Sequence, residues 1–288
     1  MRILRSIILT AFVIVSVIFG YYEYRVISDR DNEPPVIESS SDELFVSVEA
    51  TRDELLAGLK ATDNKDGDVT DTIVMVSSSY FVSGSTVKMT YAAFDSHKNV
   101  GTYTRKVTYT DYHSPRFALS QPLVFTSRSN PDYLANVSAY DVLDGDISSK
   151  ITLIAQDSTY SDSDTRTIPM IFQVTNSVGD TAEVYVNADQ ITQEAYNSPA
   201  PALSEYIIYT TVGDTSPDYR SLITGIRRGN RIDDFDDRYM KENITIDNSR
   251  VDLNEPGSYS VSYILMDREY ETVVGSTYLY VVVMEEGQ

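Results

Sequence analysis

The sequence predicts an all-β protein in which three antiparallel β-sandwiches follow one N-terminal transmembrane helix. Three observations lead to this prediction. Residues 6–22 are uncharged and almost wholly apolar, a segment of about 80 residues recurs along the rest of the chain, and apolar and polar residues alternate within each copy. Alternation with a period of two and one wet face is typical of antiparallel sheets.

Composition excludes several classes of function. The 288 residues include 43 Asp and Glu against 23 Lys and Arg, a formal net charge of −20, with two His and no Cys. A chain this acidic cannot hold nucleic acid by neutralising phosphates. The absence of Cys excludes disulfides, thiol catalysis and zinc–thiolate sites. Since no nucleophile elbow, phosphate loop, dinucleotide fingerprint or metalloprotease motif is present, we predict that the protein is not an enzyme.

Residues 1–30 are expected to form a short cytoplasmic stub, a transmembrane anchor and a linker. The apolar residues 6–22 are about long enough to cross roughly 30 Å of hydrocarbon. Arg2 and Arg5 precede them, which favours a cytoplasmic N-terminus and an extracellular C-terminal region. A cleaved signal peptide is the alternative, but the best cleavage site, Ile18-Phe19-Gly20, is a poor match to the Ala-x-Ala pattern of small residues at alternate positions. The prediction is a single-pass protein of the cell membrane.

Self-comparison of the exported region finds two close copies of one segment. Residues 61–73 (ATDNKDGDVTDTI) match residues 139–151 (AYDVLDGDISSKI) at a constant offset of 78. Val100-Gly101 and Val178-Gly179 keep the same offset. A period near 80 residues is the size of a small domain and is too long for a solenoid repeat.

A third copy is more divergent. Residues 257–267 (GSYSVSYILMD) mirror residues 84–95, but an acidic run at 233–237 stands in place of the Asp-Gly-Asp turn. The expected boundaries are 33–111 for domain 1, 112–195 for domain 2 and 199–288 for domain 3.

The strands of each copy follow from the alternation. Every second residue is apolar in three segments, at Val87–Ala93, Ile168–Val174 and Tyr259–Leu265. Tyr91, Tyr259 and Tyr263 fall on these apolar faces, so we expect them in the core and not on a sugar-binding surface. One helical signal stands out in the exported region. Thr51 and Glu54 form a capping box before a short apolar run, which predicts one or two helical turns.

These segments resemble the bacterial Ig-like domain found in pesticidal crystal proteins and in surface proteins of Gram-positive bacteria. The likeness rests on PPVI at 34–37, on the Ala-x-Asp-x-x-Asp-Gly-Asp turn within 53–73 and on the hairpin within 90–109. It is close in the first copy and weaker in the second, where Thr175-Asn176 replaces the hairpin residue Asp95. The resemblance implies three tandem Ig-like sandwiches that act as spacers, adhesion domains or ligand-presenting domains, without catalytic activity.

The Asp-Gly-Asp turns are the candidate metal sites. Calcium prefers six to eight oxygen ligands on flexible loops, which carboxylates around a glycine turn can supply. The alternative is a tight turn in which Gly adopts a positive φ and the Asp side chains cap backbone N–H groups. In the first copy, Asp95 or Asn99 would complete a calcium site only if the two loops meet. The candidate ligands are Asp63, Asp66, Asp68, Asp141, Asp144 and Asp146.

The sequence therefore predicts a membrane-anchored bacterial surface protein whose domains form an adhesion, binding or spacer module. Its expected partners are the cell membrane, through residues 6–22, and a cell-wall polymer, glycan or surface protein. No cofactor is expected other than the Ca²⁺ that the Asp-Gly-Asp turns could hold. One alternative is a wall-modifying, glycosidase-like enzyme, which would need a carboxyl group of raised pKa in a cleft. Another is a structural subunit of an envelope complex that binds no ligand of its own.

Overall fold

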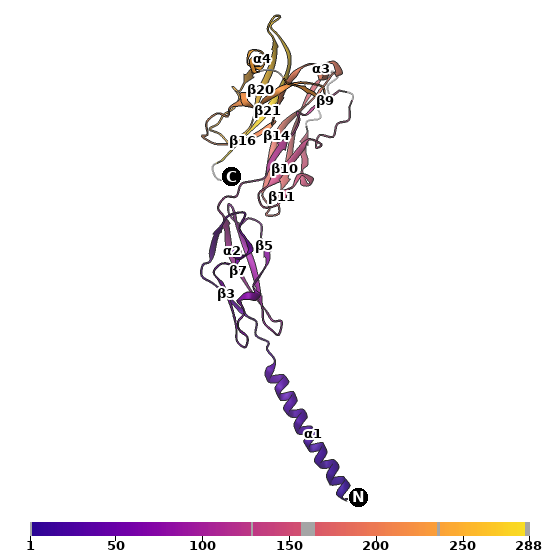
Figure 1. Ribbon diagram of the computed structural model, residues 1–288, viewed down its shortest axis with the longest axis vertical. Coiled ribbons are helices and arrows are strands. Elements are labelled where there is room, and N and C mark those ends of the chain that lie inside the picture. Colours follow the sequence, from indigo (N-terminus) through magenta and orange to yellow (C-terminus); the bar gives the residue numbers. More distant parts are fainter. Residues whose placement is uncertain (1, 128, 157–164, 235–236, 286–288) are drawn as a thin grey trace. The chain divides into compact units, whose positions relative to one another are not determined.

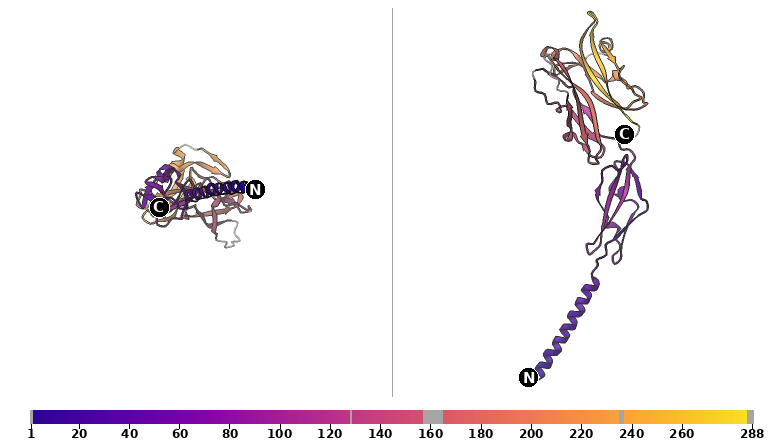
Figure 2. Two further views of the ribbon diagram at one scale, coloured as in Figure 1. Left: turned by 90° about the horizontal axis from the view of Figure 1, so that it is seen from below. Right: turned by 180° about the vertical axis from the view of Figure 1, so that it is seen from behind.

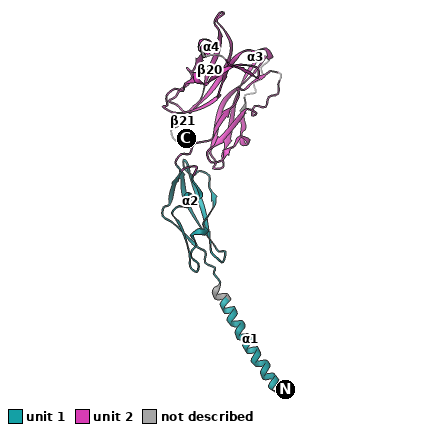
Figure 3. Cartoon of the chain, viewed as in Figure 1, with its two compact units in different colours: residues 1–46, 50–109 teal, residues 47–49, 110–288 magenta. Residues whose placement is uncertain are grey.

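A computed structural model describes residues 2–127, 129–156, 165–234 and 237–285. The chain divides into two compact units, residues 1–46 with 50–109 and residues 47–49 with 110–288 (Figure 3). The first unit contains a long N-terminal helix and one β-sandwich, and the second contains two β-sandwiches.

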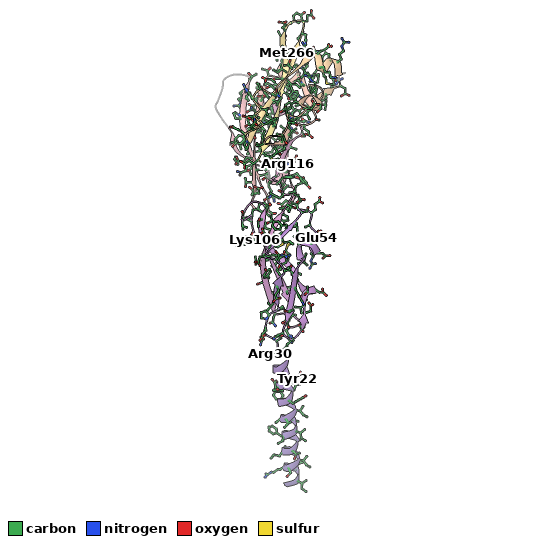
Figure 4. The ribbon with its side chains drawn as sticks, turned by 90° about the vertical axis from the view of Figure 1, so that its left-hand side faces the viewer. Tyr22, Arg30, Glu54, Lys106, Arg116 and Met266 are labelled. Atoms are coloured by element: carbon green, nitrogen blue, oxygen red, sulfur yellow. The ribbon has the colours of Figure 1, made fainter. Side chains whose placement is uncertain are left out.

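Helix α1 (Arg2–Asp29) precedes the first sandwich (Figure 1). Its segment Ile3–Arg25 is long and apolar enough to cross a membrane, and none of it is buried in the protein. Apolar side chains project from all around the helix, with Tyr22 in its C-terminal half (Figure 4). A helix that is apolar on every face requires an apolar environment, which a membrane supplies to an anchor or to a signal sequence.

The first sandwich pairs a three-stranded sheet with a four-stranded sheet. The three-stranded sheet has the order β1 (Val36–Ser39), β3 (Leu59–Asp63), β4 (Gly67–Asp68). The four-stranded sheet has the order β2 (Glu43–Val46), β7 (Val100–Tyr109), β6 (Thr86–Phe94), β5 (Val74–Ser78). Helix α2 (Arg52–Leu56) begins at Thr51, whose capping box with Glu54 is confirmed.

The same seven-strand order recurs twice in the second unit, so the prediction of three tandem sandwiches is confirmed. In the second sandwich, the three-stranded sheet has the order β8 (Arg116–Leu119), β10 (Val137–Asp141), β11 (Gly145–Asp146). Its four-stranded sheet has the order β9 (Val124–Thr126), β14 (Thr181–Ile191), β13 (Arg166–Thr175), β12 (Thr152–Gln156). The third sandwich follows helix α3 (Gln193–Asn197), and its three-stranded sheet has the order β15 (Ala200–Leu203), β17 (Ile223–Arg228), β18 (Arg231–Asp233). Its four-stranded sheet has the order β16 (Ile207–Thr211), β21 (Thr272–Met284), β20 (Gly257–Asp267), β19 (Ile244–Asp247).

In the third sandwich, β18 occupies the place of β4 and β11, and helix α4 (Asp237–Asn243) follows it. The acidic run at 233–237, which stands in place of the Asp-Gly-Asp turn, spans this connection, and its residues 235 and 236 lie outside the described residues.

Each sandwich also contains one parallel strand pair, which the alternation pattern did not predict. The second strand pairs in parallel with the last strand in all three copies, as β2 with β7, β9 with β14 and β16 with β21. The chain leaves the three-stranded sheet after its first strand and crosses to the edge of the other sheet. There it meets the last strand running in the same direction, and the other strand pairs of the described residues are antiparallel.

The alternating faces form the cores as predicted for two of the three tyrosines. Tyr91 and Tyr263 are completely buried, and each hydroxyl donates to a backbone carbonyl, that of Leu55 at 2.8 Å and that of Tyr219 at 2.7 Å. Tyr259, also expected in the core, is only half-buried. A buried tyrosine requires a hydrogen-bond partner for its hydroxyl, which these carbonyls supply.

The pairing of Val100-Gly101 with Val178-Gly179 predicted from the sequence is wrong, because the two segments occupy different positions in their sandwiches. Gly179 has a φ of 80° in the turn between β13 and β14, where the first sandwich has Lys98 with a φ of 68°. Gly101 lies within β7 opposite Ala93, and Ala182 occupies the matching position, opposite Val174. A search at constant offset cannot detect the residues that the second copy inserts between its Asp-Gly-Asp turn and this hairpin.

The two sandwiches of the second unit share one continuous core. Figure 2 shows the strands of the second sandwich, in magenta and pink, beside those of the third, in orange and yellow. Two hydroxyls connect them: the Phe117 N–H donates to Tyr209 Oη at 2.6 Å, and the Asn187 N–H donates to Tyr280 Oη at 2.8 Å. The guanidinium of Arg116 also lies over the Tyr209 ring, 5.3 Å from its centroid.

Candidate functional site

Two turns meet at one end of the first sandwich. The Asp-Gly-Asp turn joins β3 to β4, and its Gly67 has a φ of 74°, as the turn hypothesis predicted. The hairpin between β6 and β7 reaches it through Ser96, whose N–H and Oγ both donate to Asp66, at 2.6 and 2.9 Å. The condition that the two loops meet is therefore fulfilled in the first copy.

This meeting gathers four carboxylates and one imidazole. One ligand atom each from Asp63, Asp66 and Asp95 lies within 4.8 Å of the other two, and the same holds for Asp31, Asp95 and His97. Asp31, Asp63 and Asp95 are only 6%, 9% and 8% exposed. Asp31, from the segment between α1 and β1, is a member that the sequence analysis did not identify. We call Asp31, Asp63, Asp66 and Asp95 the carboxylate cluster.

Backbone donors satisfy one oxygen of each buried carboxylate at the two turns. Asp63 Oδ1 accepts the N–H groups of Asp66 and Lys65, both at 2.9 Å, and these bonds lower the pKa of Asp63. The Asp95 carboxylate accepts the N–H of Asn99 at 2.7 Å on Oδ1 and its Nδ2 at 2.6 Å on Oδ2. Asp63 is therefore ionised at neutral pH.

Two oxygens of the cluster have no donor. Asp31 Oδ1 accepts the Glu33 N–H at 3.0 Å, but Asp31 Oδ2 and Asp63 Oδ2 are buried without a hydrogen-bond partner among the described residues. Within the same part of the chain, no ion pair reaches any carboxylate of the cluster. Buried polar atoms almost always have a partner, so each of these two oxygens requires an explanation.

Asp68, the third acidic residue of the turn, lies apart from these groups. It is exposed, and its Oδ1 accepts the Thr70 N–H at 3.0 Å. Hydrogen bonds from Thr70 lower the pKa of Asp68. Asp146 plays the same part in the second sandwich, where it accepts the Ser148 N–H at 2.9 Å. Hydrogen bonds from Ser148 lower the pKa of Asp146. Both residues therefore hold the short turn that follows the strand.

In the second sandwich, the residue equivalent to Asp63 is satisfied completely by the protein. Asp141 is fully buried, and its Oδ1 accepts the N–H groups of Leu143 and Asp144, both at 2.9 Å. Its Oδ2 accepts Asn176 Nδ2 at 2.9 Å. Asn176 also donates to Tyr112 Oη at 2.8 Å, so a neutral amide stands where the first sandwich has Asp95.

Asp144, the equivalent of Asp66, has a cationic partner. Its Oδ2 accepts the Ser177 N–H at 2.8 Å, and Lys150 Nζ lies 3.0 Å from the same oxygen. Burial alone would raise the pKa of Asp144, but the bonds from Ser177 and Lys150 outweigh it and lower the pKa. At the position of Lys150 the first copy has Thr72, which is uncharged.

A second candidate site is a groove of about 360 Å³ in the second unit, between strands of its two sandwiches. Tyr185 and Asn187 of β14 lie on one side, and Ser258 and Ser260 of β20 lie on the other. A neighbouring hollow of about 370 Å³ shares Tyr185 and Ser258 with it. None of the described residues that line the 360 Å³ groove is charged, although the chain carries a net charge of −20.

Tyrosines give this groove its chemistry. Tyr185 is 52% exposed, and Tyr259, expected in the core, lines the groove instead. Tyr280 Oη binds the backbone of Asn187, and burial raises the pKa of Tyr280, so its hydroxyl stays neutral. Rings beside hydroxyl and amide groups form a surface suited to neutral polar ligands.

Comparison with known proteins identifies no family. No protein-family model matches the chain, and no curated protein matches it. The CBM51-2 and INT domains of ZmpB from Clostridium perfringens, in complex with GlcNAc, share 17% identity over 52% of this chain and 26% of that chain, with a TM-score of 0.22. The protocadherin GammaB4 extracellular domain shares 12% identity over 89% of this chain and 50% of that chain, with a TM-score of 0.19.

The lipoprotein BT2262 from Bacteroides thetaiotaomicron shares 13% identity over 54% of this chain and 99% of that chain, with a TM-score of 0.19. The chain thus spans about a quarter of the ZmpB structure and half of the protocadherin structure. Likenesses at these TM-scores carry no functional argument. The strand order of the structure itself confirms the Ig-like β-sandwich fold, whereas membership of the pesticidal crystal protein type stays a prediction.

Proposed function

We propose that this protein is a membrane-anchored bacterial surface protein whose β-sandwiches form an extracellular binding module for a neutral glycan. The groove of the second unit carries the proposal, because it combines exposed aromatic surface with uncharged hydrogen-bonding groups. Helix α1 would be retained as the anchor, with the cytoplasmic N-terminus that Arg2 and Arg5 favour. The sandwiches of the second unit would then present the groove outside the membrane.

The charge of the chain supports a neutral ligand. A net charge of −20 repels polyanions, so anionic polymers and nucleic acids are poor partners. The uncharged lining offers no ion pair to a cationic ligand either. Sugar rings present apolar C–H faces and hydroxyl edges, which match the Tyr185 ring and the hydroxyl and amide groups of Ser258, Ser260 and Asn187.

The proposal assigns no catalytic role to the module. Among the described carboxyl groups, Asp189 is the one whose pKa is raised, by burial, and it does not line the groove. Thr167 Oγ1 donates to it at 2.6 Å, as a structural partner would. A glycosidase would require a carboxyl of raised pKa and a second carboxylate facing the same cleft.

Binding can be tested with the full-length protein in detergent, co-sedimented with purified Gram-positive cell walls and, separately, with their isolated neutral polysaccharide. We expect retention by the wild type, loss of retention for Tyr185→Ala and unchanged retention for Tyr140→Ala. Tyr140 is a matched control because it is 59% exposed on β10 and does not line the groove. If the wild type is not retained, the glycan proposal is wrong, and a spacer or structural subunit becomes the better interpretation.

A further inference from the structure

We infer that the carboxylate cluster of the first sandwich is a binding site for one divalent cation of the oxygen-preferring class, Ca²⁺. This inference goes beyond the proposed function and is independent of it, since the cluster belongs to the first unit and the groove to the second.

The two unpartnered oxygens are the first evidence. Asp31 and Asp63 are both more than nine-tenths buried, and the Oδ2 of each has no donor among the described residues. Each of the two residues shares a group of nearby ligand atoms with Asp95, Asp31 together with His97 and Asp63 together with Asp66. Burying a charged oxygen without a partner is costly, and a bound cation removes that cost for several carboxylates at once.

The spacing of the cluster fits the ion. Calcium binds oxygens at about 2.4 Å, so two ligands on opposite sides of it are about 4.8 Å apart. The ligand oxygens of Asp63, Asp66 and Asp95 lie within 4.8 Å of one another. Four carboxylates can supply several of the six to eight oxygens that calcium takes, and water can supply the rest. Carboxylate-rich sets favour hard cations over zinc, which prefers nitrogen and sulfur ligands.

The second sandwich shows what replaces the cation when the protein supplies the donors itself. There, Asn176 Nδ2 donates to the buried oxygen of Asp141, and Lys150 pairs with Asp144. The first sandwich has Asp95 and Thr72 at these two positions, so it lacks both the amide donor and the positive charge. A cation among the carboxylates would perform both tasks.

The position of Asp31 gives the site a consequence for the anchor. Asp31 belongs to the segment between helix α1 and strand β1, while Asp63 and Asp95 come from the two turns of the sandwich. Asn99 Nδ2 already donates to the Asp31 backbone carbonyl at 3.2 Å. A cation bound to Asp31 and Asp95 would fasten the segment that follows the helix to the end of the first sandwich.

The test uses the full-length protein in detergent, stripped with a chelator and titrated with CaCl₂ by calorimetry. We expect saturable binding of one Ca²⁺ to the wild type and to Asp68→Asn, and loss of that binding in Asp95→Asn. Asp68→Asn removes the same charge from an exposed turn residue outside the cluster. As a second readout, Ca²⁺ should slow tryptic cleavage after Arg30, next to Asp31, at least about tenfold in the wild type and not in Asp95→Asn.

Circular dichroism shows whether Asp95→Asn is folded, and Asp63→Asn replaces it if it is not. The inference is wrong if the wild type binds no Ca²⁺ at millimolar concentration. It is also wrong if folded Asp95→Asn or Asp63→Asn binds Ca²⁺ as the wild type does, because the ion must then lie elsewhere.

Discussion

The first and second sandwiches place the same turn in the same strand order but satisfy its buried carboxylate in different ways. In both, one oxygen of the Asp that begins the turn accepts two backbone N–H groups at 2.9 Å. The other oxygen has a donor from Asn176 in the second sandwich, whereas the described part of the chain offers it none in the first, where Asp95 stands instead. A single change from carboxylate to amide separates a self-sufficient turn from one that requires a further group.

This difference shows that the turn and cation hypotheses for the Asp-Gly-Asp segments are compatible. A carboxylate has two oxygens, and the turn uses only Oδ1 of Asp63 or Asp141. The neighbouring hairpin decides what happens to Oδ2. The hairpin pair Asp95 and Asn99 of the first copy is exchanged to Asn176 and Asp180 in the second, where Tyr112 Oη donates to Asp180 at 2.7 Å.

The largest effect is expected from Gly101→Ala, which tests whether the cluster depends on the close approach of the chain before β1. A Cβ at Gly101 would lie 1.7 Å from the Pro35 carbonyl oxygen, so the strand or the preceding segment must shift. We expect the first sandwich to lose about 2–3 kcal/mol of its free energy of unfolding. Hydrogen exchange of peptides within residues 86–109 measures this loss.

The matched control for that substitution is Ala182→Gly, at the same strand position of the second sandwich. It should lower the stability of its own sandwich by no more than about 1 kcal/mol. If Gly101→Ala leaves hydrogen exchange in the first sandwich unchanged, the contact between Pro35 and β7 does not hold this segment in place.

A somewhat smaller effect is expected from Asn176→Asp, which gives the second sandwich the carboxylate of the first. It removes the donor to Asp141 and adds a negative charge beside a fully buried one. We expect a loss of about 2 kcal/mol in chelator and a partial recovery in Ca²⁺. Hydrogen exchange of peptides within residues 137–151 measures both. Asn130→Asp, an exposed site in the same sandwich, should show neither effect.

The reverse exchange, Asp95→Asn with Asn99→Asp, copies the second hairpin into the first without changing the net charge. The new amide can donate to Asp63 Oδ2, and the second substitution removes the competing donor Nδ2 of Asn99. In chelator, we expect the first sandwich to gain about 1 kcal/mol and to lose its response to Ca²⁺. Thermal unfolding with and without Ca²⁺ distinguishes this result from an unchanged response, which would contradict the comparison.

The fold was predictable because its evidence is local. Alternation at Val87–Ala93 and its counterparts marks the strands, and the repeated Asp-Gly-Asp turn marks the copies. The parallel edge strand β2 (Glu43–Val46) was not predictable, because its four residues carry no alternating pattern and its partner β7 comes much later in the chain. Only closure of the sandwich brings the two together.

In the candidate sites too, local features were predictable from the sequence, and features that depend on contacts between distant segments were not. The turn roles of Asp63 and Asp141 follow from a glycine-centred pattern that is visible in the sequence. Asp31 was missed because it precedes the first strand and belongs to no repeated motif. Asn176 was visible as a departure from the hairpin pattern, but its role as donor to Asp141 depends on a contact between two separate loops. The groove likewise depends on how two sandwiches pack.

The smallest effect is expected where the two sandwiches differ by one cross-strand pair. Thr86 and Thr108 of the first share a hydroxyl hydrogen bond at 2.7 Å, and Thr167 and Asp189 occupy the matching positions in the second. Burial raises the pKa of Asp189, and the bond from Thr167 offsets this only in part. Replacing the half-buried carboxylate by Asp189→Thr should therefore stabilise the second sandwich by less than about 1 kcal/mol at pH 7.

The pH dependence of this effect has a definite sign. A carboxyl group whose pKa is higher in the folded than in the unfolded state contributes stability that is fully present below the unfolded pKa and lost as the pH rises through the folded pKa. The wild type should therefore weaken between about pH 4 and neutrality relative to Asp189→Thr, and the two should converge in acid. Denaturant unfolding at pH 4 and pH 7 measures the difference. The opposite exchange, Thr108→Asp, should destabilise the first sandwich, because Thr108 Oγ1 donates to Glu43 at 2.8 Å and a carboxylate there would repel it.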